Sequence, residues 1–432
     1  MGAVFEAQFQ NLRDAFSRAD RDIRVARDRA GHPLYVYEAD RLLVGTDDRE
    51  AFSRVTATLR DFAPEPIDRE IAPGLVLRDI TGPQLAGLGV PEILALIDAS
   101  FGDRHPARLT AEGLPPAAPD HVLGIAKICP AGEPTVPTGD QNGPWPAQVD
   151  PGVTGRFRVT VAVSDTGLVQ PLDLGRNPWL GLVGSAAVNG DPDLVGPLLP
   201  NGLNRVDEFT GHGLFIAGVV RCSAPSADVF VNDHFTSSGG EVESVMISKL
   251  NDLLTSCQPQ VINLSAGTYT RENWQPLGMT AFGRQLHQQD IVLVAAAGND
   301  STCRPFFPAA LPRGNFPNIV SVGALGADLV NPAWFTNYGH WVDVFALGDM
   351  VNAYPVGEYT YQEPPRRPSK QQFTAGLARW EGTSYAAPMV AGMIADRIAR
   401  TGDSPTAALA AVLAQAQAMV GEGRKLLPDV RP

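Results

Sequence analysis

Five apolar runs in the last two thirds of the chain constrain its fold more than any other feature. Strands that are mostly apolar, without alternation of polar residues, are typical of a parallel sheet that helices cover on both faces. The segments Glu243–Thr255 and Met279–Gln289 supply helical crossovers between successive runs. The sequence therefore predicts an α/β fold with a doubly wound, mostly parallel sheet. The runs are Val159–Val163, Ala227–Val231, Val261–Leu264, Ile291–Ala297 and Ile319–Gly323.

Residues 1–128 predict a separate, smaller α/β or α+β module. Its apolar positions change between helical and strand spacing, in the order helix, two strands, helix, strand, helix, strand. Residues 129–152 are rich in proline and glycine and are predicted to be a linker, so that the larger domain spans 153–432. We expect helices around 5–16, 52–62 and 91–101, and strands at 34–37, 41–44, 75–80 and 121–128, with a polar turn at 38–40.

Composition excludes several classes of protein. With 44% hydrophobic and 19% charged residues, this chain of 432 residues is globular and not intrinsically disordered. Its formal charge of -13 argues against nucleic acid as a partner. The first thirty residues lack the apolar stretch of a secretory signal, and no run approaches the about eighteen apolar residues that cross a bilayer. We therefore expect no membrane span and a cytoplasmic location by default, with export by another route left open.

Four polar residues stand where chemistry would be expected, because catalytic groups of an open parallel sheet collect beyond the carboxyl ends of its strands. Asp165 and Asn299 each end an apolar run, His212 lies between two glycines, and Ser384 begins a helical stretch of small residues. A serine there has its own N–H at the positive end of the helix dipole, which suits a nucleophile whose attack creates an oxyanion. Taken singly, each residue also fits a cap, a turn or a buried structural role.

The strings around these four residues carry a family resemblance. The segments 161–167 (VAVSDTG), 211–218 (GHGLFIAG), 296–299 (AAGN) and 382–388 (GTSYAAP) resemble the four signature blocks of the subtilisin-like serine peptidases, the subtilases, in that family's order. Two further stretches, 261–267 and 335–346, resemble supporting blocks of the family. The resemblance covers about 158–400.

The resemblance implies a role for each matching position. Ser384 would be the nucleophile, His212 the general base and then acid, and Asp165 the group that orients the imidazole. Asn299, together with the Ser384 N–H, would bind the oxyanion. Ser265, Ala266 and Gly267 would bind substrate by pairing with an extended peptide. No cofactor and no metal ligands are expected: the four cysteines show no Cys-x-x-Cys spacing, and no Asp-rich loop is specific enough to indicate calcium.

The chain departs from the family pattern at three places. Leu214 stands where the family usually has threonine, and Glu381 adds a negative charge just before the serine block. The proline expected after Ala346 is missing, and residues 349–380 resemble a long insertion that borders the site as a lid or a surface loop.

These observations predict a serine endopeptidase that hydrolyses proteins or peptides through an acyl-enzyme. Two other functions stay open: a catalytically impaired peptide-binding scaffold, and a peptide ligase or cyclase of the same fold. The N-terminal module is expected to be an inhibitory or folding-assisting prodomain, or else a permanent regulatory or targeting module.

Overall fold

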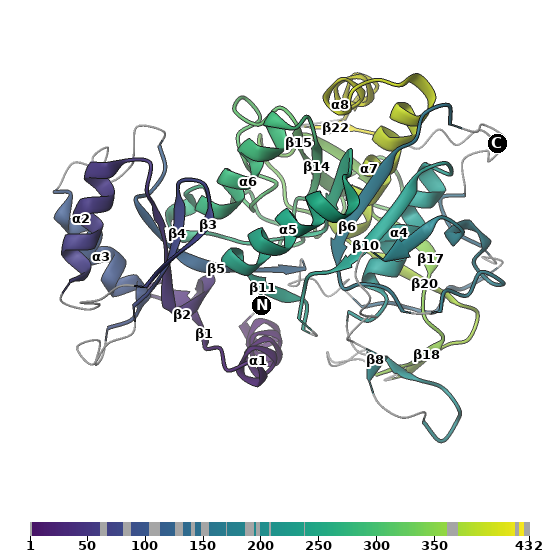
Figure 1. Ribbon diagram of the computed structural model, residues 1–432. Helices are drawn as coiled ribbons and strands as arrows, with labels where there is room; N and C mark the ends of the chain where they lie inside the picture. The colour runs from purple at the N-terminus through teal and green to yellow at the C-terminus, as the bar shows by residue number, and fades with distance from the viewer. Residues whose placement is uncertain are drawn as a thin grey trace.

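The larger sheet has nine strands and runs through the right half of Figure 1. Its order is β21-β22-β16-β15-β14-β12-β6-β10-β7, and all neighbours are parallel except β21 and β22. The predicted doubly wound parallel sheet is thereby confirmed. The computed structural model describes residues 2–60, 67–80, 88–102, 113–125, 133–139, 143–147, 155–169, 171–185, 194–195, 199–206, 209–236, 238–360, 370–419 and 423–426. The strands are β6 (Thr160–Asp165), β7 (Val183–Ser185), β10 (Asp228–Asp233), β12 (Val261–Leu264), β14 (Val292–Ala296), β15 (Ile319–Leu325), β16 (Val344–Leu347), β21 (Gln417–Ala418) and β22 (Arg424–Lys425).

Helices cover both faces of this sheet, which explains why its central strands are mostly apolar and buried. On one face, Val161 and Val163 of β6 pack with helices α4 (His212–Ser223) and α7 (Thr383–Thr401) in one hydrophobic cluster. On the other face, Ala162 and Ile262 pack with α5 (Glu243–Cys257) and α6 (Leu277–Gln288) in a second cluster. Helix α8 (Pro405–Leu413) contacts α7. No helix in the described ranges combines the length and the apolar character that crossing a membrane requires.

The N-terminal module, described over residues 2–125 with three gaps, has its own antiparallel sheet. The order β5-β2-β4-β3 has helices α2 and α3 on its outer face, at the left of Figure 1. The inner face, with Leu43, Leu75 and Leu77, packs against α5 and α6 of the larger module. The elements are α1 (Gly2–Arg18), β1 (Ile23–Arg27), β2 (Pro33–Gly45), α2 (Arg49–Leu59), β3 (Asp68–Ala72), β4 (Leu75–Asp79), α3 (Val90–Ser100) and β5 (Ala117–Ile125).

Two details of the N-terminal prediction are wrong. The polar turn expected at 38–40 does not exist, because β2 continues through it and only shifts its register against β5 between Tyr37 and Leu42. Glu38 is buried there because Arg21 and Arg41 pair with its carboxylate. Strand β3 was not expected, since its sequence DREIA is mostly polar and lies on the edge of the sheet.

Strand β5 joins the two modules. Besides β2 it pairs antiparallel with β11 (Gly240–Val242) and β13 (Ala266–Gly267) of the larger module. The predicted linker is described only at 133–139 and 143–147, where Thr135 and Trp145 bridge to Arg379 and Val351. Cys129 lies outside the described residues.

The predicted insertion forms a hairpin, which we call the arm (residues 349–381, described except 361–369). Its base is the antiparallel pair β17 (Asp349–Ala353) and β20 (Leu377–Glu381). Beyond the base, β18 (Gly357–Thr360) and β19 (Lys370–Phe373) form a small sheet with β9 (Arg205–Val206) and β8 (Leu194–Val195), at the lower right of Figure 1. Two short 3₁₀ helices, Pro178–Leu180 and Arg271–Asn273, complete the described elements.

Candidate active site

Asp165 and His212 form a buried pair. Asp165 is the last residue of β6 and His212 the first of α4, and the Oδ1–Nδ1 distance is 2.7 Å. The Thr166 N–H also donates to Asp165 Oδ1, at 2.9 Å. Gly213 makes this approach possible, because a Cβ on it would lie 2.7 Å from the carbonyl oxygen of Gly167. The sequence thus places the imidazole directly against the carboxylate.

Ser384 lies in the first turn of α7 and is 3% exposed. Its Oγ donates to the Ser265 carbonyl at 3.3 Å, while Ser265 Oγ donates to the Ser384 carbonyl at 2.8 Å. The side chain that follows it, Tyr385, has its ring centroid 5.4 Å from that of His212. The structure therefore brings Ser384, His212 and Ser265 to one small region at the carboxyl edge of the sheet.

Asn299 follows β14 and is oriented by Thr383. Its Oδ1 accepts from the Thr383 N–H at 2.9 Å and from Thr383 Oγ1 at 2.8 Å. With the oxygen so engaged, Nδ2 faces the serine turn, 3.4 Å from where a Cβ on Gly382 would stand. An amide donor thus lies beside the backbone that precedes Ser384.

The position expected for a bound peptide is occupied by the chain's own β5. Ala266 and Gly267 pair with Ile125 and Gly124, and on the other side of β5 the Ile125 N–H donates to the Gly239 carbonyl at 2.9 Å. Leu123 of β5 is fully buried, in a cluster that also holds phenylalanines and two methionines of the larger module. Sequence reasoning missed this pairing, because a strand's partner across the molecule leaves no local signal.

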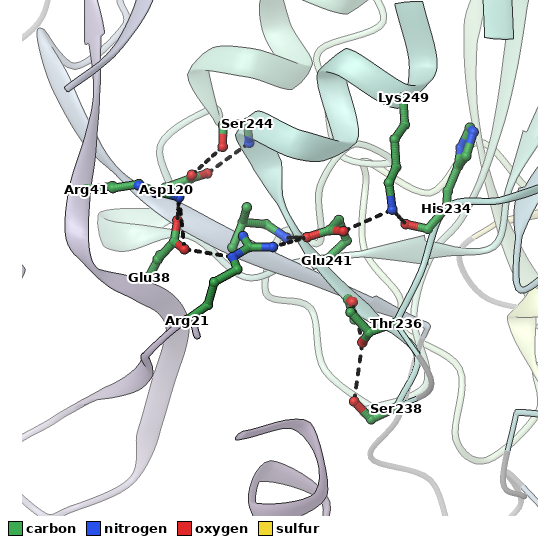
Figure 2. Close-up of polar contacts among 12 residues, drawn as sticks. Arg21, Glu38, Arg41, Asp120, His234, Thr236, Ser238, Glu241, Ser244 and Lys249 are labelled. Carbon is green, nitrogen blue, oxygen red and sulfur yellow. Dashed lines mark hydrogen bonds and ion pairs between the residues drawn. The ribbon is translucent and has the colours of Figure 1, made fainter. Parts of the chain in front are cut away.

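Polar contacts hold β5 and its module in place, as Figure 2 shows. Asp120 of β5 accepts from the Ser244 N–H at 2.9 Å and from Ser244 Oγ at 2.5 Å. Arg21 donates to Glu38 at 2.8 Å and to Glu241 of β11 at 2.9 Å, joining the two modules. Burial, together with the negative charge of Glu38, raises the pKa of the Asp120 carboxyl to about 8. The interface therefore contains a carboxyl group that prefers its protonated form.

His234, which directly follows β10, makes a buried hydrogen bond away from the Asp165–His212 pair. Its Nδ1 lies 2.7 Å from Ser164 Oγ, and burial with the nearby Lys249 charge lowers its pKa to about 3. The ring is therefore neutral, which suits a structural hydrogen bond. Among the described residues, no group of three or more His, Cys, Asp or Glu side chains could hold a metal ion.

An aromatic cluster around His212 was not expected from the sequence. The rings of Phe209, Trp380 and Tyr385 contact the imidazole. Burial and the Asp165 charge raise the pKa of Tyr385, so its hydroxyl stays protonated. Leu214, one of the departures from the family pattern, is buried in α4. Glu381 is half-buried at the end of β20; the hydrogen bond from Arg379 to Asp349, and to a lesser extent the Glu381 charge, raise the pKa of Arg379.

Comparison with known proteins places this geometry in context. The model of the subtilase family matches residues 158–424. A thermophilic serine proteinase of Bacillus sp. (strain AK1) is 29% identical over 228 residues, which cover 47% of this chain and 48% of that protein. Alkaline elastase YaB of Bacillus sp. (strain YaB) is 26% identical over 270 residues, 60% of this chain and 59% of that protein. The matches thus span about half the length of these curated relatives.

A solved structure shares the fold. Fervidolysin from Fervidobacterium pennivorans, a keratinolytic enzyme related to subtilisin, superimposes with a TM-score of 0.54 at 18% sequence identity. The match covers 85% of this chain and 56% of that one. It therefore extends beyond the nine-stranded sheet.

Proposed function

This chain belongs to the subtilase family, and from that premise we propose that it is a serine endopeptidase whose catalytic triad is Asp165, His212 and Ser384. The observation that carries the proposal is the buried 2.7 Å contact between Asp165 Oδ1 and His212 Nδ1, beside the helix that begins at Ser384. A carboxylate at Nδ1 keeps the proton there and leaves Nε2 to act as the base.

The proposed reaction proceeds through an acyl-enzyme. Ser384 Oγ attacks the peptide carbonyl carbon while His212 Nε2 takes its proton, and the imidazolium then protonates the departing amine. Asn299 Nδ2 and the Ser384 N–H stabilise the oxyanion of each tetrahedral intermediate. A water molecule, deprotonated by His212, then releases the carboxylic acid and restores the serine. Asp165 remains ionised throughout and stabilises the imidazolium.

We further infer that the N-terminal module is an intramolecular inhibitor. An extended peptide substrate would add as a strand to Ala266 and Gly267, and β5 already pairs with both residues. On its other edge, β5 pairs with Gly240 of β11, and the Ile125 N–H donates to the Gly239 carbonyl. Strand β5 is therefore hydrogen-bonded to the larger module along both edges. Substrate can therefore bind only after β5 leaves.

Peptide hydrolysis by the full chain tests the protease proposal. Wild type, Ser384→Ala and Ser321→Ala would be incubated with a mixture of unstructured peptides, and the products and the protein itself followed by mass spectrometry. Ser321 is an equally buried serine in β15, so its variant controls for loss of a hydroxyl. Hydrolysis by wild type and Ser321→Ala but not by Ser384→Ala is expected. Turnover that persists in Ser384→Ala would refute the assignment.

The same assay separates hydrolysis from the two other functions. With an excess of a second amine present, a ligase yields products heavier by that amine, whereas the proposed hydrolase yields free carboxylic acids. A wild type that binds peptides but leaves them intact, even once its N-terminal module has been removed, would be a scaffold.

A further inference from the structure

The aromatic rings around His212 have no role in the reaction as proposed. Trp380 lies with its ring centroid 5.4 Å from that of the imidazole and an interplanar angle of 89°. Tyr385 lies at 5.4 Å and 54°, and Phe209 at 6.4 Å and 75°. All three are at most 4% exposed. A catalytic base is thus packed in aromatic side chains.

Trp380 belongs to the arm and is itself held in place. Its ring packs at 87° against Phe215 of α4 and at 78° against Tyr354 of the arm. Its backbone is opposite Met350 in the β17–β20 ladder, so the register of the hairpin fixes where the ring stands. Tyr385 is equally constrained, because it follows Ser384 in α7 and packs 4.7 Å from Phe215.

One hydrogen bond does not fix an imidazole. The contact from Nδ1 to Asp165 fixes one vertex of the ring, but the ring can still pivot about that contact and change the direction in which Nε2 points. Rings packed against the imidazole from the arm and from α7 oppose this pivot, because edge-to-face aromatic contacts favour a narrow range of ring orientations.

We propose that Trp380 and Tyr385 are positioning residues that hold the His212 imidazole with Nε2 toward Ser384. This inference rests on the proposed protease function. It also gives the arm a role in catalysis: the hairpin sets the orientation of the general base, so the insertion is part of the active-site architecture.

The test compares Trp380→Leu, Trp380→Phe and Phe373→Leu in the full chain, with peptide kinetics over a range of pH. Phe373 is the matched control, since it is as buried as Trp380 and packs on Tyr354, one ring further from His212. Thermal unfolding of each variant measures the structural cost separately.

Trp380→Leu is expected to lower kcat about tenfold, with KM changed less than about twofold. The pH dependence of kcat/KM should also change, and Trp380→Phe, which keeps an aromatic ring at this position, should restore most of both properties. Phe373→Leu should leave the kcat and the pH profile near wild type. If Trp380→Leu does not fold, Tyr385→Met provides the same comparison from α7.

Two results would overturn the inference: a wild-type kcat and pH profile in folded Trp380→Leu, or an equal change in Phe373→Leu. Both leave the protease proposal standing. Failure of wild type to cleave peptides even once its N-terminal module has been removed refutes that proposal instead, so the two can fail separately.

Discussion

Docking of the N-terminal module should depend on pH through Asp120. Docking buries this carboxyl against Ser244 and near Glu38, and its pKa rises to about 8 from an ordinary value near 3.8. When β5 leaves the larger module, Asp120 becomes hydrated and its pKa returns toward the ordinary value. Between about pH 4 and pH 8 docking must therefore take up one proton.

The direction of the pH dependence of docking follows from that proton. Because the docked state binds it and the undocked state does not, raising the pH favours undocking, by at most tenfold per pH unit or about 1.4 kcal/mol. The dependence vanishes below about pH 4, where both states are protonated, and above about pH 8, where both are ionised.

The assay is the rate at which a fluorophosphonate labels Ser384 in the intact chain. Docked β5 pairs with Ala266 and Gly267, next to the Ser265 that contacts Ser384, so docked molecules are expected to react more slowly. Asp120→Asn keeps the shape of the side chain but has no proton to exchange. Dividing the wild-type rate by that of Asp120→Asn cancels the pH dependence of the labelling chemistry and of the other interface groups. The ratio is expected to rise steadily from about pH 4 to pH 8. A flat or falling ratio would refute the reasoning about Asp120.

Three further changes test other parts of the account. Asn299→Ala should lower kcat by on the order of 10² to 10³ while KM changes little, as steady-state kinetics would show; a loss confined to KM would contradict the oxyanion role. Gly213→Ala should lower the free energy of unfolding, measured with denaturant, by about 1–3 kcal/mol and remove most of the activity, because its Cβ would lie 2.7 Å from the Gly167 carbonyl oxygen. A variant with wild-type stability and activity would show that the backbone here can move to accommodate the added methyl group. Arg21→Gln should raise the fluorophosphonate labelling rate of the intact chain about tenfold or more, because it leaves the buried carboxylates of Glu38 and Glu241 without this cation. An unchanged rate would exclude a role in docking for the ion pairs of Arg21.

The central sheet could be predicted because its strands carry a local signal. Val292–Ala296 is apolar at every position and fully buried, so composition alone identifies it as an interior strand. The continuation of β2 through residues 38–40 had no such signal. Glu38 looks like a turn residue until its charge is neutralised by Arg41, three residues on in the same strand, and by Arg21.

The candidate site could be predicted in part for the same reason. Asp165, His212, Asn299 and Ser384 each stand in a short, recognisable string, so their roles could be proposed from sequence. Trp380 carries no such string, and its place beside His212 depends on how a long hairpin folds back. The docking of β5 depends likewise on contacts between residues more than a hundred positions apart, such as Asp120 with Ser244.

The central claim is that Asp165, His212 and Ser384 act as one unit. The most direct measurement is peptide mapping by mass spectrometry after a fluorophosphonate has reacted with wild type, His212→Ala and Asp165→Asn. The account predicts a single adduct on Ser384 in wild type, none in His212→Ala, and strongly slowed labelling in Asp165→Asn. An adduct on another residue, or labelling of Ser384 that proceeds equally fast without the His212 imidazole, would contradict it.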